Sequence, residues 1–320
     1  MPEEDNNYDM STPETTGRRI VLVSYFLGGG KHVGESLNQN PDVFYWLEPR
    51  PDIGDVNEEF ILDHMTSYTS DRHPEAEGQK DYVRNLIRIL RCQFVDMDDQ
   101  FFNYFLSTFA QSRALSNITQ CQDDSFASNP EGCKLMAKRV CQSSLLTVIN
   151  SIRLSHLDTA MWKLLAAADV RIYITIRDPR AIVSSLLSHV TDPESNRSRD
   201  LAASYTQVLC ARIQGDIDRS DSLSGKWLSY ETFVHNPEDG DLLQNVYDAP
   251  IPEVVRSWLK KNTRQSAEVV GIDWKNSKEV GDKWGKEMDI DLQLVITRIT
   301  TTPPCNLVKL DYPANVLEWF

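Results

Sequence analysis

The chain has 320 residues, 41% of them hydrophobic, and a formal net charge of −14 at pH 7. This length and composition support one large domain or two modest ones with a real hydrophobic core, and they exclude a wholly disordered protein. The acidic balance argues against non-specific binding to nucleic acid or to an anionic membrane, so any anionic ligand must be held by a local group of residues.

The chain begins with a polar, acidic stretch over residues 1–17 that contains no apolar segment. Such a stretch predicts a disordered leader and argues against a signal peptide. Unbroken apolar runs elsewhere are short, as in residues 20–23, whereas a helix needs roughly 20 apolar residues to cross a bilayer. No transmembrane helix is therefore expected.

A strand is predicted over residues 18–27, which are rich in β-branched and aromatic residues and run into three glycines. A short helix is predicted over residues 31–40, ended by Pro41. Residues 96–142 show weak periodicity and hold three cysteines, so they are interpreted as an insertion packed over the sheet. This gives a single domain over residues 18–315.

A second strand is predicted over residues 170–177, where apolar residues from Val170 to Ile176 alternate with Arg171, Tyr173 and Thr175. The segment after it carries Pro179, which suits the first turn of a helix. A third strand is predicted over residues 225–230. Amphipathic helices are predicted over residues 80–95, 143–157, 199–217, 252–262 and 282–299.

Strands that alternate with helices predict an α/β protein with a parallel sheet covered on both faces. In such sheets ligands bind beyond the carboxyl ends of the strands. Gly28 and Arg177 both fall at that edge of the predicted sheet, so the two strand-to-helix junctions are the first places to look for a site.

Six cysteines lack any C-x-x-C pair, so neither a zinc cluster nor another metal site is expected. Cys121 and Cys133 bracket a loop, and Asn117 and Asn196 begin N-x-[ST] sequons. Together these features favour an oxidising secretory compartment with disulfides and glycosylation. Buried free thiols in a cytosolic protein are the alternative.

The first junction contains Gly28, Gly29 and Gly30, followed by Lys31 and His32. Glycines allow positive φ and a close approach of the backbone to a ligand, and the N–H groups of a helix start favour an anion. A Walker A loop is poorly matched, because the positions of its first glycine and its hydroxyl are filled by other residues. A glycine turn that only lets helix and strand pack is the alternative.

The second junction is the segment R-D-P-R, in which Arg177 closes a strand and Ser185 follows it by eight residues. An arginine and a hydroxyl can bind one phosphate together. An ordinary cap or ion pair between Arg177 and Asp178 is the alternative. The two junctions together suit a ligand with two separated phosphates, such as a 3′,5′-bisphosphorylated nucleotide.

The stretch over residues 18–49 resembles the amino-terminal motif of the Golgi carbohydrate sulfotransferases that act on 6-hydroxyls of galactose, N-acetylglucosamine or N-acetylgalactosamine. The matching residues are Val33, Gly34, Glu35, Asn40, Pro41, Asp42, Val43, Phe44, Tyr45, Glu48 and Pro49. The segment I-T-I-R-D-P-R-A-I-V-S-S resembles the second motif of the family, and Tyr230, Glu231 and Pro237 match a third. The resemblance covers about residues 18–312.

This resemblance implies the sulfotransferase fold, an α/β fold with a P-loop-like parallel sheet flanked by helices. It implies 3′-phosphoadenosine 5′-phosphosulfate as the co-substrate, with the 5′-phosphosulfate held by residues 28–32 and the 3′-phosphate by Arg177 and Ser185. It also implies transfer of a sulfuryl group to a sugar hydroxyl, without a metal.

The chain departs from the family where the chemistry takes place. The basic residue of the family's 5′-phosphosulfate loop falls on Leu27, so Lys31 and His32 are the nearest candidates to supply the missing cation. Glu48 is the predicted catalytic base, with Glu35 and His32 as alternatives. A protein that binds nucleotide or glycan without turnover is the competing hypothesis, and a nucleotide kinase is a third.

The resemblance implies a glycan or proteoglycan acceptor, no nucleic-acid partner and a location in the Golgi. Acceptor contacts are expected in residues 50–80 and 96–142. Members of the family carry a membrane anchor, so the lack of one in this sequence suggests either an incomplete chain or a soluble departure.

Overall fold

The fold is seen in a computed structural model of the chain. It describes residues 17–25, 27–47, 76–99, 102, 112–115, 121, 129–152, 159–187, 196–222, 225–237, 241–264, 267–269, 272–274, 284–303 and 305. The predicted leader, apart from Gly17, and the predicted base Glu48 lie outside these residues.

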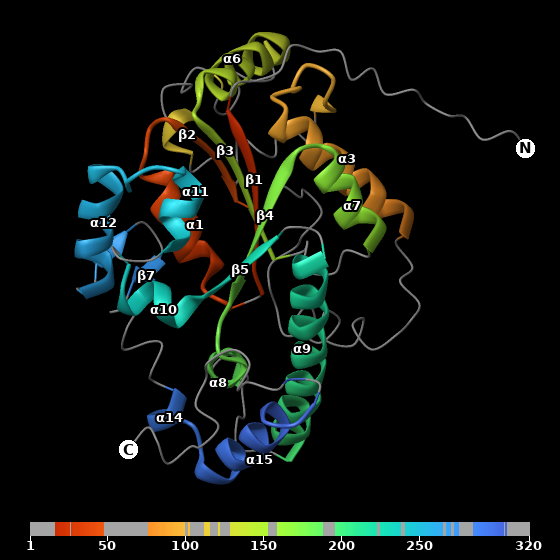
Figure 1. Ribbon diagram of the computed structural model, residues 1–320, viewed down its shortest axis with the longest axis vertical. Helices are drawn as coiled ribbons and strands as arrows, with labels where there is room; N and C mark the ends of the chain where they lie inside the picture. Colours follow the sequence, from red (N-terminus) through yellow and green to blue (C-terminus); the bar gives the residue numbers. More distant parts are fainter. Residues whose placement is uncertain are drawn as a thin grey trace, which may run out of the picture.

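Five parallel strands form one sheet in the order β2-β3-β1-β4-β5 (Figure 1). They are β1 (Arg18–Val23), β2 (Val43–Leu47), β3 (Leu146–Ser151), β4 (Val170–Ile176) and β5 (Lys226–Ser229). Parallel neighbours need crossover connections, and each connection here contains at least one helix. The predicted α/β class, a parallel sheet flanked by helices, is confirmed.

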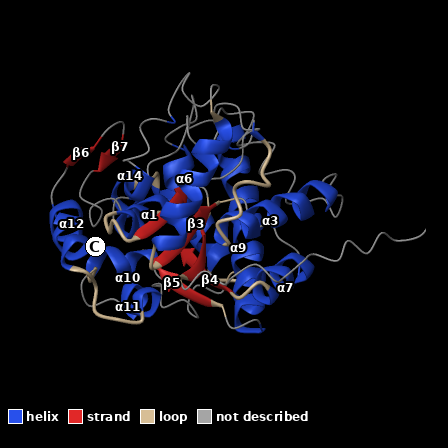
Figure 2. Cartoon of the chain, turned by 90° about the horizontal axis from the view of Figure 1, so that it is seen from above, coloured by secondary structure: helices blue, strands red, loops and turns tan. Residues whose placement is uncertain are grey.

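Both faces of the sheet are buried, and Figure 2 shows the strands between two groups of helices. Because successive side chains of a strand point to opposite faces, Val21 and Val23 of β1 belong to one apolar cluster and Ile20 and Leu22 to another. The first cluster includes residues of α3 (Ala76–Leu90), α7 (Thr159–Ala167) and α9 (Asn196–Ser222). The second includes residues of α1 (Gly30–Asn38), α10 (Tyr230–His235), α11 (Asp241–Tyr247) and α12 (Glu253–Arg264).

Three further helices lie beyond the carboxyl ends of the strands (Figure 1). They are α8 (Pro179–Leu187), α14 (Trp284–Glu287) and α15 (Ile290–Thr300). The prediction of one helix over residues 282–299 is corrected here, because the side chain of Asp289 accepts a hydrogen bond from the Leu292 N–H and so caps a new helix.

The helix predicted over residues 143–157 is wrong where the structure describes a strand, over Leu146–Ser151, and residues 153–157 lie outside the described residues. Leu146–Ser151 is β3, paired with β1 on one side and β2 on the other. Its short apolar run has no readable period, and its β-branched residues pack well in a central strand. β4 also differs from its predicted alternation, since Arg171 is its single exposed residue.

The remaining described elements lie outside the sheet. They are the 3-10 helix η1 (Arg113–Leu115), α6 (Pro130–Ser143) and an antiparallel pair of short strands, β6 (Ala267–Val269) and β7 (Ile272–Trp274). α6 was not predicted and falls in the proposed insertion over residues 96–142. The domain boundaries at residues 18 and 315 stay a prediction.

All six cysteines are paired in disulfides: Cys92–Cys141, Cys121–Cys133 and Cys210–Cys305. The first pair joins Cys92, which precedes the predicted insertion, to Cys141 near its end, and the second pair lies within it. Disulfides persist in oxidising compartments, so this pairing favours the secretory interpretation over buried free thiols. In the described part of the chain, no group of three or more His, Cys, Asp or Glu residues is placed to hold a metal ion.

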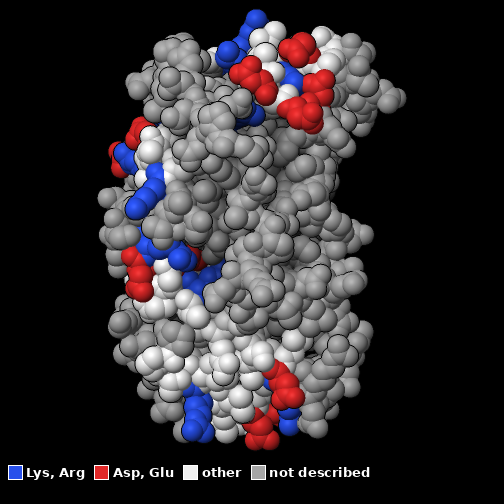
Figure 3. Space-filling view, turned by 90° about the vertical axis from the view of Figure 1, so that its right-hand side faces the viewer, with Lys and Arg blue, Asp and Glu red and all other residues white. Residues whose placement is uncertain are grey.

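Charged side chains of both signs are mixed over the described part of the face shown in Figure 3. The net charge of −14 therefore does not take the form of one large acidic area on that part of the surface. None of the helices within the described ranges is both long enough and apolar enough to cross a membrane.

Candidate functional site

The first junction lies between β1 and α1, at the carboxyl edge of the sheet. α1 begins at Gly30, and Gly29 before it has a φ of 80°. The N–H of Gly28 donates to the carbonyl oxygen of Tyr25 over 2.8 Å, which closes the turn. The first N–H groups of a helix have no acceptor within it, so an anion at this end would meet those of Gly30 and Lys31.

Two of the glycines are also required by packing. A Cβ on Gly29 would lie 2.3 Å from the ring of Tyr230, and a Cβ on Gly30 would lie 2.0 Å from the Oγ of Ser24. The hypothesis of a glycine turn that permits close packing is therefore correct as far as it goes. It does not exclude an anion site, because this packing uses the Cβ positions of the glycines and leaves the N–H groups of Gly30 and Lys31 without an acceptor inside the helix.

Leu27 holds the turn in an unusual conformation. Its φ is 59°, a left-handed value that non-glycine residues rarely adopt. Its half-buried side chain packs against the apolar cluster on the α9 face of the sheet. Its carbonyl oxygen accepts a hydrogen bond from the Nη1 of Arg177 over 2.7 Å.

Arg177 directly follows β4, the neighbour of β1 in the sheet, and is 5% exposed. Its guanidinium carbon lies 5.5 Å from the centre of the Tyr230 ring, and Tyr230 directly follows β5. Residues at three neighbouring strand ends therefore meet. The structure brings Arg177 and the glycine junction together, as their shared sheet edge predicts.

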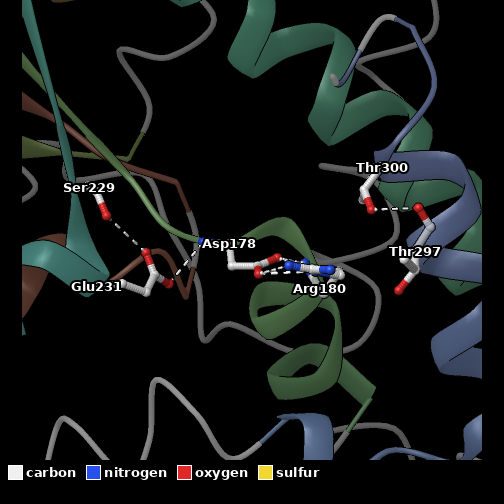
Figure 4. A network of polar contacts seen from close by, with 6 residues as sticks. All are labelled: Asp178, Arg180, Ser229, Glu231, Thr297 and Thr300. Atoms are coloured by element: carbon white, nitrogen blue, oxygen red, sulfur yellow. Dashed lines mark hydrogen bonds and ion pairs between the residues drawn. The ribbon is translucent and has the colours of Figure 1, made fainter. Parts of the chain in front are cut away.

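The ion pair of the R-D-P-R segment is formed by Asp178 and Arg180 (Figure 4). The Nε and Nη2 atoms of Arg180 donate to the carboxylate of Asp178 over 2.6–3.0 Å, and both side chains are almost fully buried. The guanidinium of Arg180 also lies 4.6 Å from the centre of the Trp284 ring. The alternative of an ion pair between Arg177 and Asp178 is thus not what these contacts show, but Asp178 does cap α8, because its Oδ1 accepts from the N–H of Arg180 over 2.8 Å.

Glu231 joins the second junction to the end of β5. Its carboxylate accepts hydrogen bonds from the N–H of Asp178 over 3.0 Å and from the Oγ of Ser229 over 3.4 Å (Figure 4). These bonds fix the turn that carries Arg177. Ser185, the predicted partner of Arg177, is half-buried and lies nearly two turns into α8.

Lys31 is the second residue of α1 and is exposed. Desolvation by neighbouring atoms lowers the pKa of its ammonium group, and the charge of Glu35 acts in the opposite direction. Burial raises the pKa of the Glu35 carboxyl, although hydrogen bonds from the amides of Asn38 and Gln39, over 3.0 and 2.6 Å, oppose this shift. A carboxyl with a raised pKa suits a general base, so Glu35 stays an alternative to Glu48.

His32 is 3% exposed and is surrounded by the rings of Tyr230, Phe233 and Trp258. Its Nδ1 lies 3.4 Å from the hydroxyl oxygen of Tyr230. Burial lowers the pKa of this imidazole to about 4. His32 is therefore neutral at pH 7 and adds no positive charge to the loop, which leaves Lys31 as the cation of the two.

The lowered pKa of His32 predicts a loss of stability in acid. The unfolded chain binds a proton near the ordinary pKa of 6.5, whereas the folded chain binds it only near 4, so acid favours unfolding in this interval. We expect the free energy of unfolding to fall by about 2 kcal/mol on this account between about pH 7 and pH 5. Chemical denaturation at both pH values, with wild type and His32→Gln, measures the effect.

The variant should lack this part of the pH dependence. The exposed residue His235 provides the matched control, and His235→Gln should keep the slope of the wild type. A slope that is the same in His32→Gln and wild type would show that His32 does not change its protonation on unfolding.

The sequence analysis missed Asn150, which lies near the end of β3. Its Nδ2 donates to the carbonyl oxygen of Gly30 over 2.8 Å and to the hydroxyl of Tyr45 over 3.2 Å. Its Oδ1 accepts a hydrogen bond from Ser24 over 3.3 Å. Asn150 ends the β-branched run T-V-I, and a polar residue in that position indicates a strand-end site. It was overlooked because a helix was predicted there.

The predicted base Glu48 follows β2 directly and lies outside the described residues. Most of residues 50–80, where acceptor contacts are expected, lie outside them too. The roles of these segments stay predictions.

Comparison with known proteins finds relatives that are named as carbohydrate sulfotransferases. The chain is 28% identical to carbohydrate sulfotransferase 5 of Mus musculus over 196 residues, which covers 55% of this chain and 45% of that protein. It is 22% identical to carbohydrate sulfotransferase 3 of Mus musculus, with 88% of this chain and 66% of that protein covered. The chain is a homologue of the carbohydrate sulfotransferases. It spans about half of the length of the first of these relatives and about two thirds of the second.

No protein-family model matches the chain. Among solved structures, a sulfotransferase domain from the curacin biosynthetic pathway is 14% identical, with a TM-score of 0.48 and coverage of 93% of this chain and 98% of that chain. The sulfotransferase domain of the Synechococcus PCC 7002 olefin synthase is also 14% identical, with a TM-score of 0.45 and coverage of 95% and 97%. The sequence similarity to the carbohydrate sulfotransferases confirms the family resemblance that the motifs indicate.

Proposed function

We propose that the chain transfers a sulfuryl group from 3′-phosphoadenosine 5′-phosphosulfate to a 6-hydroxyl of a glycan. The observation that carries the proposal is the contact of the two strand-end junctions, in which the Nη1 of Arg177 lies 2.7 Å from the carbonyl oxygen of Leu27. A nucleotide with a phosphate at each of its 3′ and 5′ positions can engage both junctions, and the homology with carbohydrate sulfotransferases supports this donor.

The 5′-phosphosulfate is assigned to residues 28–32 and the 3′-phosphate to Arg177 and Ser185. The residues fit the donor in two respects. The start of α1 carries N–H groups that have no acceptor inside the helix, and a buried guanidinium lies beside the same turn. Charge-assisted hydrogen bonds of these two kinds are those that proteins use for phosphate.

In the proposed reaction the oxygen of the sugar hydroxyl attacks sulfur, and the bond from sulfur to the 5′-phosphate oxygen breaks. The hydroxyl proton passes to a base, and the products are a sulfate ester and adenosine 3′,5′-bisphosphate. Negative charge grows on the departing phosphate oxygen. By analogy with phosphoryl transfer, positioning and electrostatic stabilisation supply most of the rate.

Lys31 is the proposed cation for the departing oxygen, because it is charged, lies at the start of α1 and has a side chain long enough to fold back over the loop. Glu48 is the proposed base. Glu35, whose pKa is raised by burial, is the alternative base on α1. His32, with a pKa of about 4, is neutral and would accept a proton only weakly.

A second candidate function is binding of the nucleotide or of a glycan without turnover. The observation that favours it is Leu27, whose side chain packs against the apolar cluster where the related loop has a basic residue. Backbone N–H groups would still hold the phosphates in that case.

The proposed acceptor is a glycan or proteoglycan, and the proposed location is the Golgi lumen. The names of the relatives support the class of acceptor. The three disulfides support an oxidising compartment.

Two measurements on the wild-type chain test the proposal. Calorimetry with adenosine 3′,5′-bisphosphate measures binding of the donor product, and a donor-dependent assay on glycans with free 6-hydroxyls measures transfer. Binding together with transfer is the expected result. Binding without transfer on any acceptor would favour the second candidate, and absence of binding would contradict both transfer and nucleotide binding.

A further inference from the structure

Arg177 reaches the first junction because of the register of two parallel strands. Val23 of β1 pairs with Ile174 of β4. Leu27 follows Val23 by four residues, and Arg177 follows Ile174 by three. The arginine is therefore level with the turn that contains Leu27. The Nη1 atom closes the gap with the 2.7 Å hydrogen bond to the carbonyl oxygen of Leu27.

The guanidinium of Arg177 is held on a second side by Tyr230. The ring centre of Tyr230 lies 5.5 Å from the guanidinium carbon, and the same ring leaves no room for a Cβ on Gly29. Burial raises the pKa of Tyr230 to about 12, so its hydroxyl stays neutral. Arg177 thus touches one residue of the loop and shares a neighbour with another.

The carboxylate next to Arg177 in the sequence is directed elsewhere. Asp178 is bound by two nitrogen atoms of Arg180, and its own N–H donates to Glu231. Because Arg177 is 5% exposed, its charge is little screened by water and acts strongly on a ligand at the turn.

We propose that Arg177 supplies the positive charge that the loop lacks at position 27, and that this one guanidinium serves the 5′-phosphate of the donor as well as its 3′-phosphate. The inference rests on the proposed function and adds the source of charge at the 5′ side. A guanidinium has five N–H donors in a planar fork, so a bond to the Leu27 oxygen does not use up the group. Lys31 is exposed and is the second residue of α1. In this arrangement it acts mainly on the departing oxygen during transfer.

The test uses a ligand that has only the 5′-phosphate. Adenosine 5′-monophosphate and adenosine 3′,5′-bisphosphate are titrated into wild type, Arg177→Gln and Lys31→Ala. Arg177→Gln should weaken binding of the monophosphate about tenfold or more, since a charge-assisted bond to phosphate is lost. Lys31→Ala should weaken binding of the monophosphate less than Arg177→Gln does, because Lys31 is proposed to act mainly on the departing oxygen during transfer.

The matched control is Arg171→Gln, at the other end of β4, where the arginine is exposed and pairs with Asp248. This variant should bind both nucleotides as the wild type does. Arg177→Lys covers the case in which Arg177→Gln does not fold, because it keeps the charge and loses the fork, and it too should weaken the monophosphate.

The outcomes separate the inference from the proposed function. If the wild type binds the bisphosphate but the arginine variants bind the monophosphate as well as the wild type does, the inference is overturned and the function stands. The same conclusion holds if the wild type shows no measurable affinity for the monophosphate. If the wild type does not bind the bisphosphate, the proposed function fails.

Discussion

Replacement of Lys31 by alanine is expected to abolish sulfuryl transfer while adenosine 3′,5′-bisphosphate still binds. In the proposed reaction, charge grows on the departing phosphate oxygen only during transfer, and the apolar side chain of Leu27 cannot stabilise it. Removal of one group that stabilises such charge typically lowers kcat by about 100-fold to 1,000-fold. The measurement is kcat with saturating donor and glycan, beside the calorimetric affinity for the bisphosphate.

Two variants serve as controls for this prediction. Leu27→Ala should leave transfer largely intact, because its side chain packs against the apolar cluster. Lys163→Ala, at an exposed lysine of α7, should have no effect. Equal activity of Lys31→Ala and wild type would reject the assignment. If the assignment holds, Leu27→Arg should raise activity above that of the wild type only where Lys31 is a poor substitute for the family's basic residue.

The positions of the two junctions could be predicted from the sequence because each is a local pattern. The run Gly28–Gly30 after an apolar strand indicates a turn at the carboxyl edge, and the segment after Ile176 does the same for β4. Parallel strands place their carboxyl ends at one edge of the sheet. The placement of Arg177 and this turn at the same edge of the sheet therefore follows from the fold class.

The partners of individual side chains could not be predicted. The hydrogen bond from Arg177 to Leu27 joins residues 150 positions apart and depends on the register of β1 with β4. The segment R-D-P-R gives no sign of which arginine binds Asp178. Asn150 was missed for a different reason, since a short apolar run fits a helix and a buried strand equally well.

The burial of His32 could not be predicted from the sequence either. Next to Lys31 in a glycine-rich loop, it reads as an exposed candidate base or cation. Its aromatic neighbours Phe233 and Trp258 come from α10 and α12, about 200 residues later in the chain, and they remove it from water. Chemistry predicted from residue type can thus be reversed by distant packing.

The second large effect is expected from Arg180→Met, which leaves the carboxylate of Asp178 buried without its bidentate partner. Both side chains of this pair are at most 2% exposed. Loss of one member of a buried ion pair typically costs about 3–5 kcal/mol, because the remaining charge is not compensated. The free energy of unfolding from chemical denaturation at neutral pH is the measurement.

The double variant Asp178→Asn, Arg180→Met separates the unpaired charge from lost packing. Asp178 accepts a hydrogen bond from the backbone N–H of residue 180 over 2.8 Å, and asparagine at position 178 keeps an oxygen that can accept it. Both the single and the double variant lose the contact of Arg180 with Trp284. The double variant should therefore be more stable than Arg180→Met. Arg171→Met, which removes an exposed pair with Asp248, should be nearly as stable as the wild type, because water screens this pair. If Arg180→Met were no less stable than this control, the buried pair would not be what holds the turn beside Arg177.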